Sequence, residues 1–233
     1  VYAMDPAGRA LFVLAGGSIT RYDTASGAAA ALPFSAELDR ENAWVGQQLH
    51  FQIKLYTQVG ITAFDMLDLP QFEGFYAQER QRFDTRTQYR TIKGQRYAIR
   101  ILHEICLFPQ RAGVLKIGPA RVRLGIEQPN LGAYFGSRPE IMQTRPVKVK
   151  VKPVPEPVPA GFSGGVGRYN WQVSADLDTL STDQALTLTI AVEGNGDAQR
   201  FANPVLELPD GLEGFEPKIR QQEAYKSSEQ FIH

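Results

Sequence analysis

The sequence has little cysteine, little histidine and no excess of charge of either sign. Its 233 residues include one cysteine, Cys106, and three histidines. A single cysteine excludes an internal disulfide and a cysteine-based zinc site. Lys plus Arg and Asp plus Glu are 25 each, so the formal net charge is 0. The concentrated basic charge of a nucleic-acid-binding protein is missing, and we expect no nucleic-acid partner.

Long hydrophobic runs are missing as well. No apolar run of about 20 residues, the length that spans a bilayer, occurs in the chain, and no signal peptide opens it. Either the protein is soluble as written, or an export signal and a membrane anchor lie outside this chain. Hydrophobic residues nevertheless make up 43% of the sequence, which is enough to build real cores and argues against wholesale disorder.

Recognisable catalytic motifs are also missing. The chain has no G-x-S-x-G motif, no phosphate-binding loop and no carboxylate dyad. The run from His103 to Cys106 lies on an expected strand and lacks the paired histidines of a zinc-protease helix. Apolar neighbours favour a buried thiol at Cys106 over a nucleophile. The sequence therefore predicts no catalytic residues and no enzymatic activity.

Two other polar clusters are interpreted as turns. Asp176, Asp178 and Asp183 lack the glycine-centred spacing of a calcium loop. Residues 194–196, Gly-Asn-Gly, are interpreted as a hairpin turn and not a phosphate site, because no helix start follows them. We expect no metal and no cofactor.

Alternation of apolar and polar residues is the strongest positive signal. Leu49, Phe51, Ile53 and Leu55 alternate with polar residues, and an equal run covers residues 186–193. A period of two marks a strand with one face in a core. Many short strands, frequent turns and no helical period predict an all-β protein of tandem immunoglobulin-like β-sandwich domains.

An internal repeat organises these strands. Residues 35–39, Ser-Ala-Glu-Leu-Asp, return as Ser-Ala-Asp-Leu-Asp at 174–178, an offset of 139 (174 minus 35). The same offset carries Leu49 onto Leu188 and residues 69–70 onto 208–209, both Leu-Pro. We interpret this pattern as two related β modules.

The repeat and the composition predict four segments. They are an N-terminal hairpin, upstream-module remnant or propeller-blade fragment (1–31), an immunoglobulin-like β-sandwich (32–152), a Pro/Gly-rich linker (153–167) and a second immunoglobulin-like domain (168–233). By the offset, the second module stops well before the first one does, so we expect it to be truncated or completed by residues outside this chain.

Three stretches of the first module have specific predictions. Residues 96–108 are apolar on both sides, which is typical of a central strand. One face has Tyr97, Ile99, Ile101, Ile105 and Leu107, and the other has Ala98, Leu102, Cys106 and Phe108. Residues 127–145 are interpreted as a loop within the last hairpin. Residues 146–152 are expected to form a strand with valines inward, and its lysines suit an edge.

Several of these pieces together resemble one family, the BatD (Bacteroides aerotolerance, or oxygen-tolerance) proteins. The resemblance covers about residues 34–220, and its strongest part is the glycine-rich run 159–167. The other pieces are 45–47 leading into 56–57, 69–75, 107–113 with 117–119, 149–155, 194–196 and 208–209.

The resemblance implies a non-catalytic protein of the periplasm, anchored in the inner membrane by a C-terminal segment outside this chain. It implies tandem immunoglobulin-like domains and work beside von Willebrand factor A domain Bat proteins and TPR-containing Bat proteins. A MoxR-type ATPase belongs to the same system, whose role is aerotolerance or envelope stress.

Binding surfaces are therefore the main functional prediction. Tyr134 and Phe135 lie between glycines and are a possible partner-binding pair, because aromatic side chains often carry interface energy. A mobile or self-packed loop is the alternative. Separately, an unfinished second sheet could accept a partner strand by β-augmentation. A carbohydrate-binding or adhesive β-sandwich of the cell envelope is the other function class, which an exposed flat row of aromatics would favour.

Overall fold

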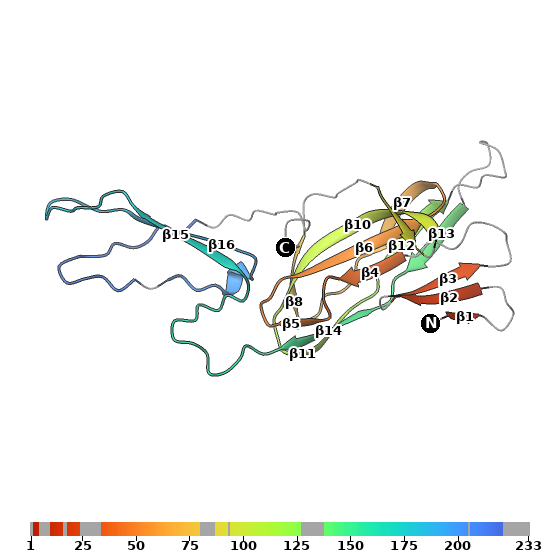
Figure 1. Ribbon diagram of the computed structural model, residues 1–233, viewed down its shortest axis with the longest axis horizontal. Coiled ribbons are helices and arrows are strands. Elements are labelled where there is room, and N and C mark those ends of the chain that lie inside the picture. Colours follow the sequence, from red (N-terminus) through yellow and green to blue (C-terminus); the bar gives the residue numbers. More distant parts are fainter. Residues whose placement is uncertain are drawn as a thin grey trace.

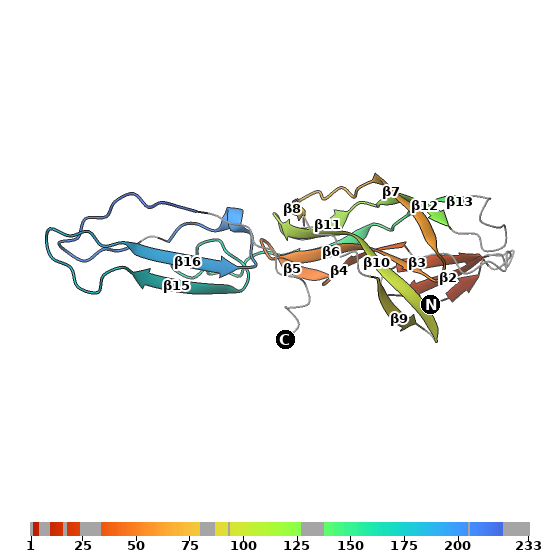
Figure 2. The ribbon, with the colours of Figure 1, turned by 90° about the horizontal axis from the view of Figure 1, so that it is seen from above.

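The protein is all-β in a computed structural model that describes residues 2–4, 10–15, 18–23, 34–79, 87–92, 94–126, 138–204 and 206–220. The only helical element among these residues is a single 3-10 turn, η1 (Ala198–Arg200). The molecule is elongated, with a two-stranded ribbon at one end and a small three-stranded sheet at the other (Figures 1 and 2). The all-β prediction is confirmed.

The N-terminal sheet has the strand order β1-β2-β3. Its strands are β1 (Tyr2–Met4), β2 (Ala10–Ala15) and β3 (Ser18–Asp23). Ala15 lies opposite Ser18 in the antiparallel pair of β2 and β3. Only two residues separate these strands, as expected for the predicted hairpin. The strand β1 was not predicted.

One layer of the central sandwich has the strand order β4-β6-β10-β8, and β9 also pairs with β10. Its strands are β4 (Phe34–Leu38), β6 (Leu49–Thr57), β8 (Phe75–Glu79), β9 (Gln88–Ile92) and β10 (Gln95–Pro109). The facing strands form two small sheets, β11-β14-β5 and β13-β12-β7. They are β5 (Asn42–Trp44), β7 (Ile61–Asp68), β11 (Gly113–Ile117), β12 (Arg121–Ile126), β13 (Arg138–Gln143) and β14 (Val147–Lys152).

The core lies between these layers. Every second residue of β6 is buried, from Leu49 to Thr57, which confirms the period-two prediction. Phe51 meets Phe72 edge to face, with ring centroids 5.4 Å apart. From the facing layer, Leu115 and Val149 join the same cluster.

Strand β10 contains a bulge that the sequence pattern hid. Its register against β6 shifts between Ile101 and His103. After the bulge Ile105 lies opposite Phe51, but before it Ile99 lies opposite Tyr56. Phe51 and Tyr56 are on opposite faces of β6, because they are an odd number of residues apart. The prediction of one apolar stripe from Tyr97 to Leu107 is therefore wrong, since the extra residue moves the stripe to the other face.

Two predictions about the end of the first module are corrected. Residues 138–143 form strand β13, paired with β12, instead of a loop. Strand β14 is not an edge, because it lies between β11 and β5. Its valines do point inward: Val149 and Val151 are buried while the lysines are exposed. Proline at 139 did not prevent a strand, since β13 is itself an edge.

The second module contributes the antiparallel ribbon of β15 (Tyr169–Ala175) and β16 (Leu188–Gly194). Its geometry repeats that of β4 and β6. The Asp39 carboxylate accepts from the His50 amide at 2.9 Å, and the Asp176 carboxylate accepts from the Thr187 amide at 2.8 Å. Both aspartates also donate their own amide to the carbonyl of the same partner residue.

These paired contacts define the repeat as an offset of 137 (176 minus 39, and 187 minus 50). The 139-residue offset taken from the Ser-Ala-x-Leu-Asp match is therefore wrong at the ribbon by two residues. The two-residue slip keeps every side chain on the same face, which is why the apolar pattern did not reveal it. Leu49 corresponds to Leu186, and Phe51 corresponds to Leu188.

Candidate functional site

The predicted partner-binding residues Tyr134 and Phe135 lie outside the described residues. The pair stays a prediction.

The other sequence candidate, the His103–Cys106 segment, is a packed part of the sandwich. Cys106 is 2% exposed and accepts a hydrogen bond from Gln48 Nε2 at 3.1 Å. His50 Nδ1 lies 4.0 Å from its sulfur. Within the described ranges no three His, Cys, Asp or Glu side chains gather as a metal site would require. Reactive cysteines are ordinarily partly exposed, so the burial of Cys106 argues against a nucleophile.

His103 lies opposite Ile53 on the core side of β10. Burial lowers its pKa below the usual 6.5, and the negative charge of Glu79 opposes part of this shift. On acidification the unfolded chain takes up this proton at a higher pH than the folded chain does. The free energy of unfolding should therefore fall as the pH drops through 6.5 towards the folded-state pKa.

We expect His103→Gln to reduce the dependence of the free energy of unfolding on pH below about pH 6.5, the ordinary histidine pKa. The measurement is urea unfolding at a series of pH values from about 7.5 to 5, spanning the ordinary histidine pKa. An unchanged slope in the variant would show that other groups carry the pH dependence.

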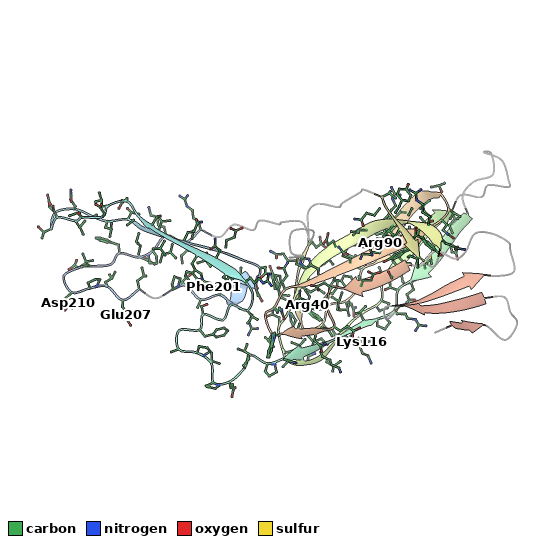
Figure 3. The ribbon with its side chains drawn as sticks, viewed as in Figure 1. Arg40, Arg90, Lys116, Phe201, Glu207 and Asp210 are labelled. Carbon is green, nitrogen blue, oxygen red and sulfur yellow. The ribbon has the colours of Figure 1, made fainter. Side chains whose placement is uncertain are left out.

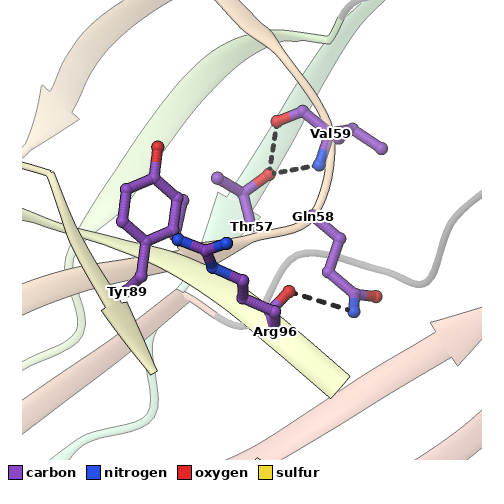
Figure 4. Close-up of a pocket in the computed structure, with 6 residues that line it drawn as sticks. Thr57, Gln58, Val59, Tyr89 and Arg96 are labelled. Carbon is purple, nitrogen blue, oxygen red and sulfur yellow. Dashed lines mark hydrogen bonds between the residues drawn. The ribbon is translucent and has the colours of Figure 1, made fainter. Parts of the chain in front are cut away.

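A shallow depression of about 390 Å³ lies where β6 ends beside β9 and β10 (Figure 4). The Arg96 guanidinium stacks over the Tyr89 ring at 4.4 Å, and Gln58 Nε2 donates to the Arg96 carbonyl at 3.4 Å. The Thr57 hydroxyl donates to the Val59 carbonyl at 2.7 Å. These polar groups bond to one another, and nothing in the depression suggests a catalytic arrangement.

The two modules meet at a small polar joint built around Asp197. This residue is 1% exposed; one carboxylate oxygen accepts from Gln110 Nε2 at 2.8 Å and the other from the Gln199 amide at 3.0 Å. Its own amide donates to the Gly46 carbonyl at 3.2 Å. Arg200 Nη1 approaches the Gln110 carbonyl at 3.4 Å. The joint thus ties η1 to the turns after β5 and β10.

We expect Asp197→Ala to loosen the modules relative to each other. The variant removes the Asp197 acceptor that Gln110 Nε2 and the Gln199 amide share, so that Gln110 Nε2 keeps only the Phe108 carbonyl, at a cost of about 1–3 kcal/mol. Pulsed EPR between spin labels on the two modules should show a broadened distance distribution. Asp178→Ala is the matched control, because Asp178 is exposed and accepts a hydrogen bond from the hydroxyl of its neighbour Thr179 at 3.4 Å. Equal broadening in both variants would contradict the assignment.

Glycines next to the joint make room for an aromatic cluster. Phe201, which is labelled in Figure 3, packs on Tyr169 and Trp171. Its ring centroid lies 5.3 Å from that of Tyr169 and 5.8 Å from that of Trp171. A Cβ at Gly194 or Gly196 would collide with the Tyr169 side chain. The stretch 194–196 ends β16 and leads into η1, so it is a turn but not the predicted hairpin.

The ribbon exposes the face that its counterpart buries. Trp171 and Val173 on β15 are 47% and 62% exposed, and Leu188 on β16 is 41% exposed. Among the described residues from 168 to 220, Asp197 alone is buried. We call the apolar side of β15 and β16 the ribbon face; its members are Trp171, Val173, Leu186, Leu188, Ile190 and Val192.

Opposite the ribbon, the extended stretch 206–220 also leaves apolar side chains uncovered. Phe215 is 88% exposed, and residues 209–212 make a turn in which the Leu212 amide donates to the Pro209 carbonyl at 3.2 Å. Glu207 and Asp210 mark this stretch at the far end of the molecule (Figure 3). Exposed apolar surface on this scale is characteristic of interaction sites.

Comparison with protein families matches residues 36–151 to the model of the BatD DUF11-like domain. The chain belongs to the BatD family. The match runs from β4 into β14, so the BatD domain coincides with the central sandwich and the predicted family is confirmed. No curated protein and no solved structure matches the chain. Within the described part of this BatD protein, no helix has the length and apolarity needed to cross a membrane.

The aromatic residues of the BatD domain bear on the two function classes. Phe72 and Phe75 pack against the core, and Tyr76 stacks on Phe108 with centroids 5.9 Å apart. In the described part of the chain the most exposed aromatics, Tyr89, Trp171 and Phe215, lie on separate elements instead of one row. This arrangement favours protein interaction over glycan binding.

Proposed function

We propose that this BatD protein is a non-catalytic protein-interaction module of the cell envelope, part of the ectodomain of a membrane-anchored periplasmic protein. Its partners are von Willebrand factor A domain and TPR-containing Bat proteins, in a system with a MoxR-type ATPase that serves aerotolerance or envelope stress. The BatD match over residues 36–151 carries the proposal. The exposed ribbon face supports it, because large uncovered apolar surfaces mark protein contacts.

The test is co-purification of the full-length protein from membranes, followed by identification of the proteins retained. The expected result is retention of Bat proteins that carry von Willebrand factor A or TPR domains. Binding of the purified chain to a glycan panel, without retained Bat proteins, would contradict the proposal in favour of a carbohydrate-binding sandwich.

A paired substitution tests the predicted aromatic contact within this function. Tyr134→Ser with Phe135→Ser is expected to weaken retention of the partner while leaving the melting curve unchanged, since loop aromatics often anchor interfaces. Full retention of the partner would rule out this pair.

A further inference from the structure

The strand β9 and the part of β10 that pairs with it, residues 88–92 and 95–99, form what we call the hairpin arm. Every residue of β9 is exposed, and none belongs to the core cluster. The strand is therefore held by its pairing with β10 and not by burial. The arm lies at the margin of the molecule (Figure 2). Surface segments that contribute little to a core commonly carry function.

The arm concentrates positive charge in a chain whose formal net charge is 0. Residues 80–100, which include the arm, have one acidic residue against seven lysines and arginines, at positions 80, 82, 86, 90, 93, 96 and 100. Arg90, Arg96 and Arg100 are exposed, and none of the ion pairs between described residues includes them. Positive charge that the chain itself leaves unpaired is complementary to an anionic partner.

One guanidinium of the arm is oriented for a planar anionic group. The Arg96 guanidinium stacks over the Tyr89 ring at 4.4 Å, and the Arg96 carbonyl accepts from Gln58 Nε2 at 3.4 Å (Figure 4). These two contacts hold the side chain and the backbone of Arg96 without using its guanidinium N–H groups. A stacked guanidinium loses less conformational freedom on binding, and its fork of N–H groups matches a carboxylate.

The surroundings of this guanidinium favour a protein ligand. Arg96 borders the depression of about 390 Å³ beside the end of β6, and of the described residues that line the depression only Arg96 is charged. Tyrosine and arginine are enriched at protein interfaces, whereas lysine is depleted. A concave site with one stacked arginine suits an acidic side chain of a protein better than it suits a flat anionic membrane surface.

We propose that the hairpin arm binds an acidic segment of a partner protein, with one carboxylate paired to Arg96 beside the Tyr89 ring. A second acidic side chain pairs with Arg100, which is on the same face of β10 because it lies four residues from Arg96 with no bulge between them. The inference rests on the proposed interaction function and specifies the surface and the chemistry of the partner.

The probe is a fluorescein-labelled peptide of eight glutamates, titrated into the 233-residue chain. The control peptide has eight glutamines and the same label. We expect saturable binding of the glutamate peptide that weakens as salt is added, because salt screens interactions between exposed charges. We expect no measurable binding of the glutamine peptide.

Variants of the arm locate the site. Arg96→Gln should weaken binding of the glutamate peptide about tenfold or more, because a hydrogen bond between charged groups is lost. Arg96→Lys should restore little of the affinity, since lysine lacks the planar fork. Tyr89→Phe keeps the ring and should retain binding, whereas Tyr89→Ala should weaken it. Arg121→Gln is the matched control and should leave binding nearly unchanged, because it removes the same charge from an exposed arginine already paired with Asp68 at 3.0 Å.

Thermal melting of each variant checks that the fold is retained. No binding of the glutamate peptide, or equal affinity for the parent chain and Arg96→Gln, would overturn the inference. Binding to phosphatidylglycerol vesicles without binding of the peptide would also overturn it, in favour of a membrane surface. Peptide binding without retained Bat proteins would leave the inference standing and contradict the proposed function, and retained Bat proteins without peptide binding would do the reverse.

Discussion

Replacement of Leu49 by alanine is expected to lower the free energy of unfolding of the BatD domain by about 2–5 kcal/mol, as for other large-to-small changes in a closed core. The same replacement at the equivalent Leu186 should cost less than about 1 kcal/mol, since partly exposed side chains contribute little. Leu49 is fully buried, at 0% exposure, and Leu186 is 40% exposed. The residue type and place in the repeat are the same, so the difference measures burial alone.

The two tryptophans allow the modules to be followed separately during denaturant unfolding. Trp44 lies on β5 and Trp171 lies on β15, so Trp44→Phe isolates the ribbon signal and Trp171→Phe isolates the sandwich signal. If Leu186→Ala lowered the free energy of unfolding as much as Leu49→Ala does, the ribbon face would be buried and not exposed.

Gly164→Ala is expected to destabilise the packing of the glycine-rich run against η1 by about 1–3 kcal/mol more than Gly161→Ala does. Both glycines have positive φ, +85° at Gly164 and +78° at Gly161, so the free-energy cost of a left-handed backbone is about the same for an alanine at either position. The space around the two glycines differs. A Cβ atom added at Gly164 would collide with the Arg200 carbonyl, whereas nothing lies within 4 Å of a Cβ atom added at Gly161.

The readout is near-UV circular dichroism of the cluster of Tyr169, Trp171 and Phe201, together with its melting. Gly164→Ala should reduce the aromatic signal and its melting temperature, and Gly161→Ala should retain the signal. Equal effects in both variants would show that backbone conformation, and not contact with Arg200, explains why glycine stands at 164.

Local signals predicted much of the fold. Alternation in β6 and β14 identified the strands and their buried faces, because a half-buried strand must alternate. The Leu-Pro pair of residues 69–70, which the sequence shows, follows directly after β7, as expected because proline removes a ladder donor.

Features that depend on pairing between distant strands could not be predicted in this way. The bulge in β10 adds one residue without any change in composition, so only the pairing with β6 reveals it. The position of β14 between β11 and β5 also follows from tertiary contacts. The 137-residue offset was obscured because the pattern Ser-Ala-x-Leu-Asp occurs twice at a spacing of 139. In the second copy the contact that Asp39 makes is made by Asp176, two residues before the aspartate that ends the pattern.

The joint gave even less signal in the sequence. Asp197 follows a glycine-rich turn and would ordinarily be expected to be exposed, as most aspartates are. Its burial depends on Gln110, which is 87 residues away in the chain. By contrast, the resemblance of the glycine-rich run to BatD proteins was informative, and the structure gives a physical reason for those glycines in the contacts of Tyr169, Phe201 and Arg200.

Residue-resolved hydrogen exchange of the 233-residue chain distinguishes an open second edge of β16 from a paired one. We expect Leu188, Ile190 and Val192, whose amides point away from β15, to exchange much faster than Thr189 and Ala191, while all interior amides of β6 are protected. Equal protection of even- and odd-numbered amides along β16 would show instead that its second edge is already paired.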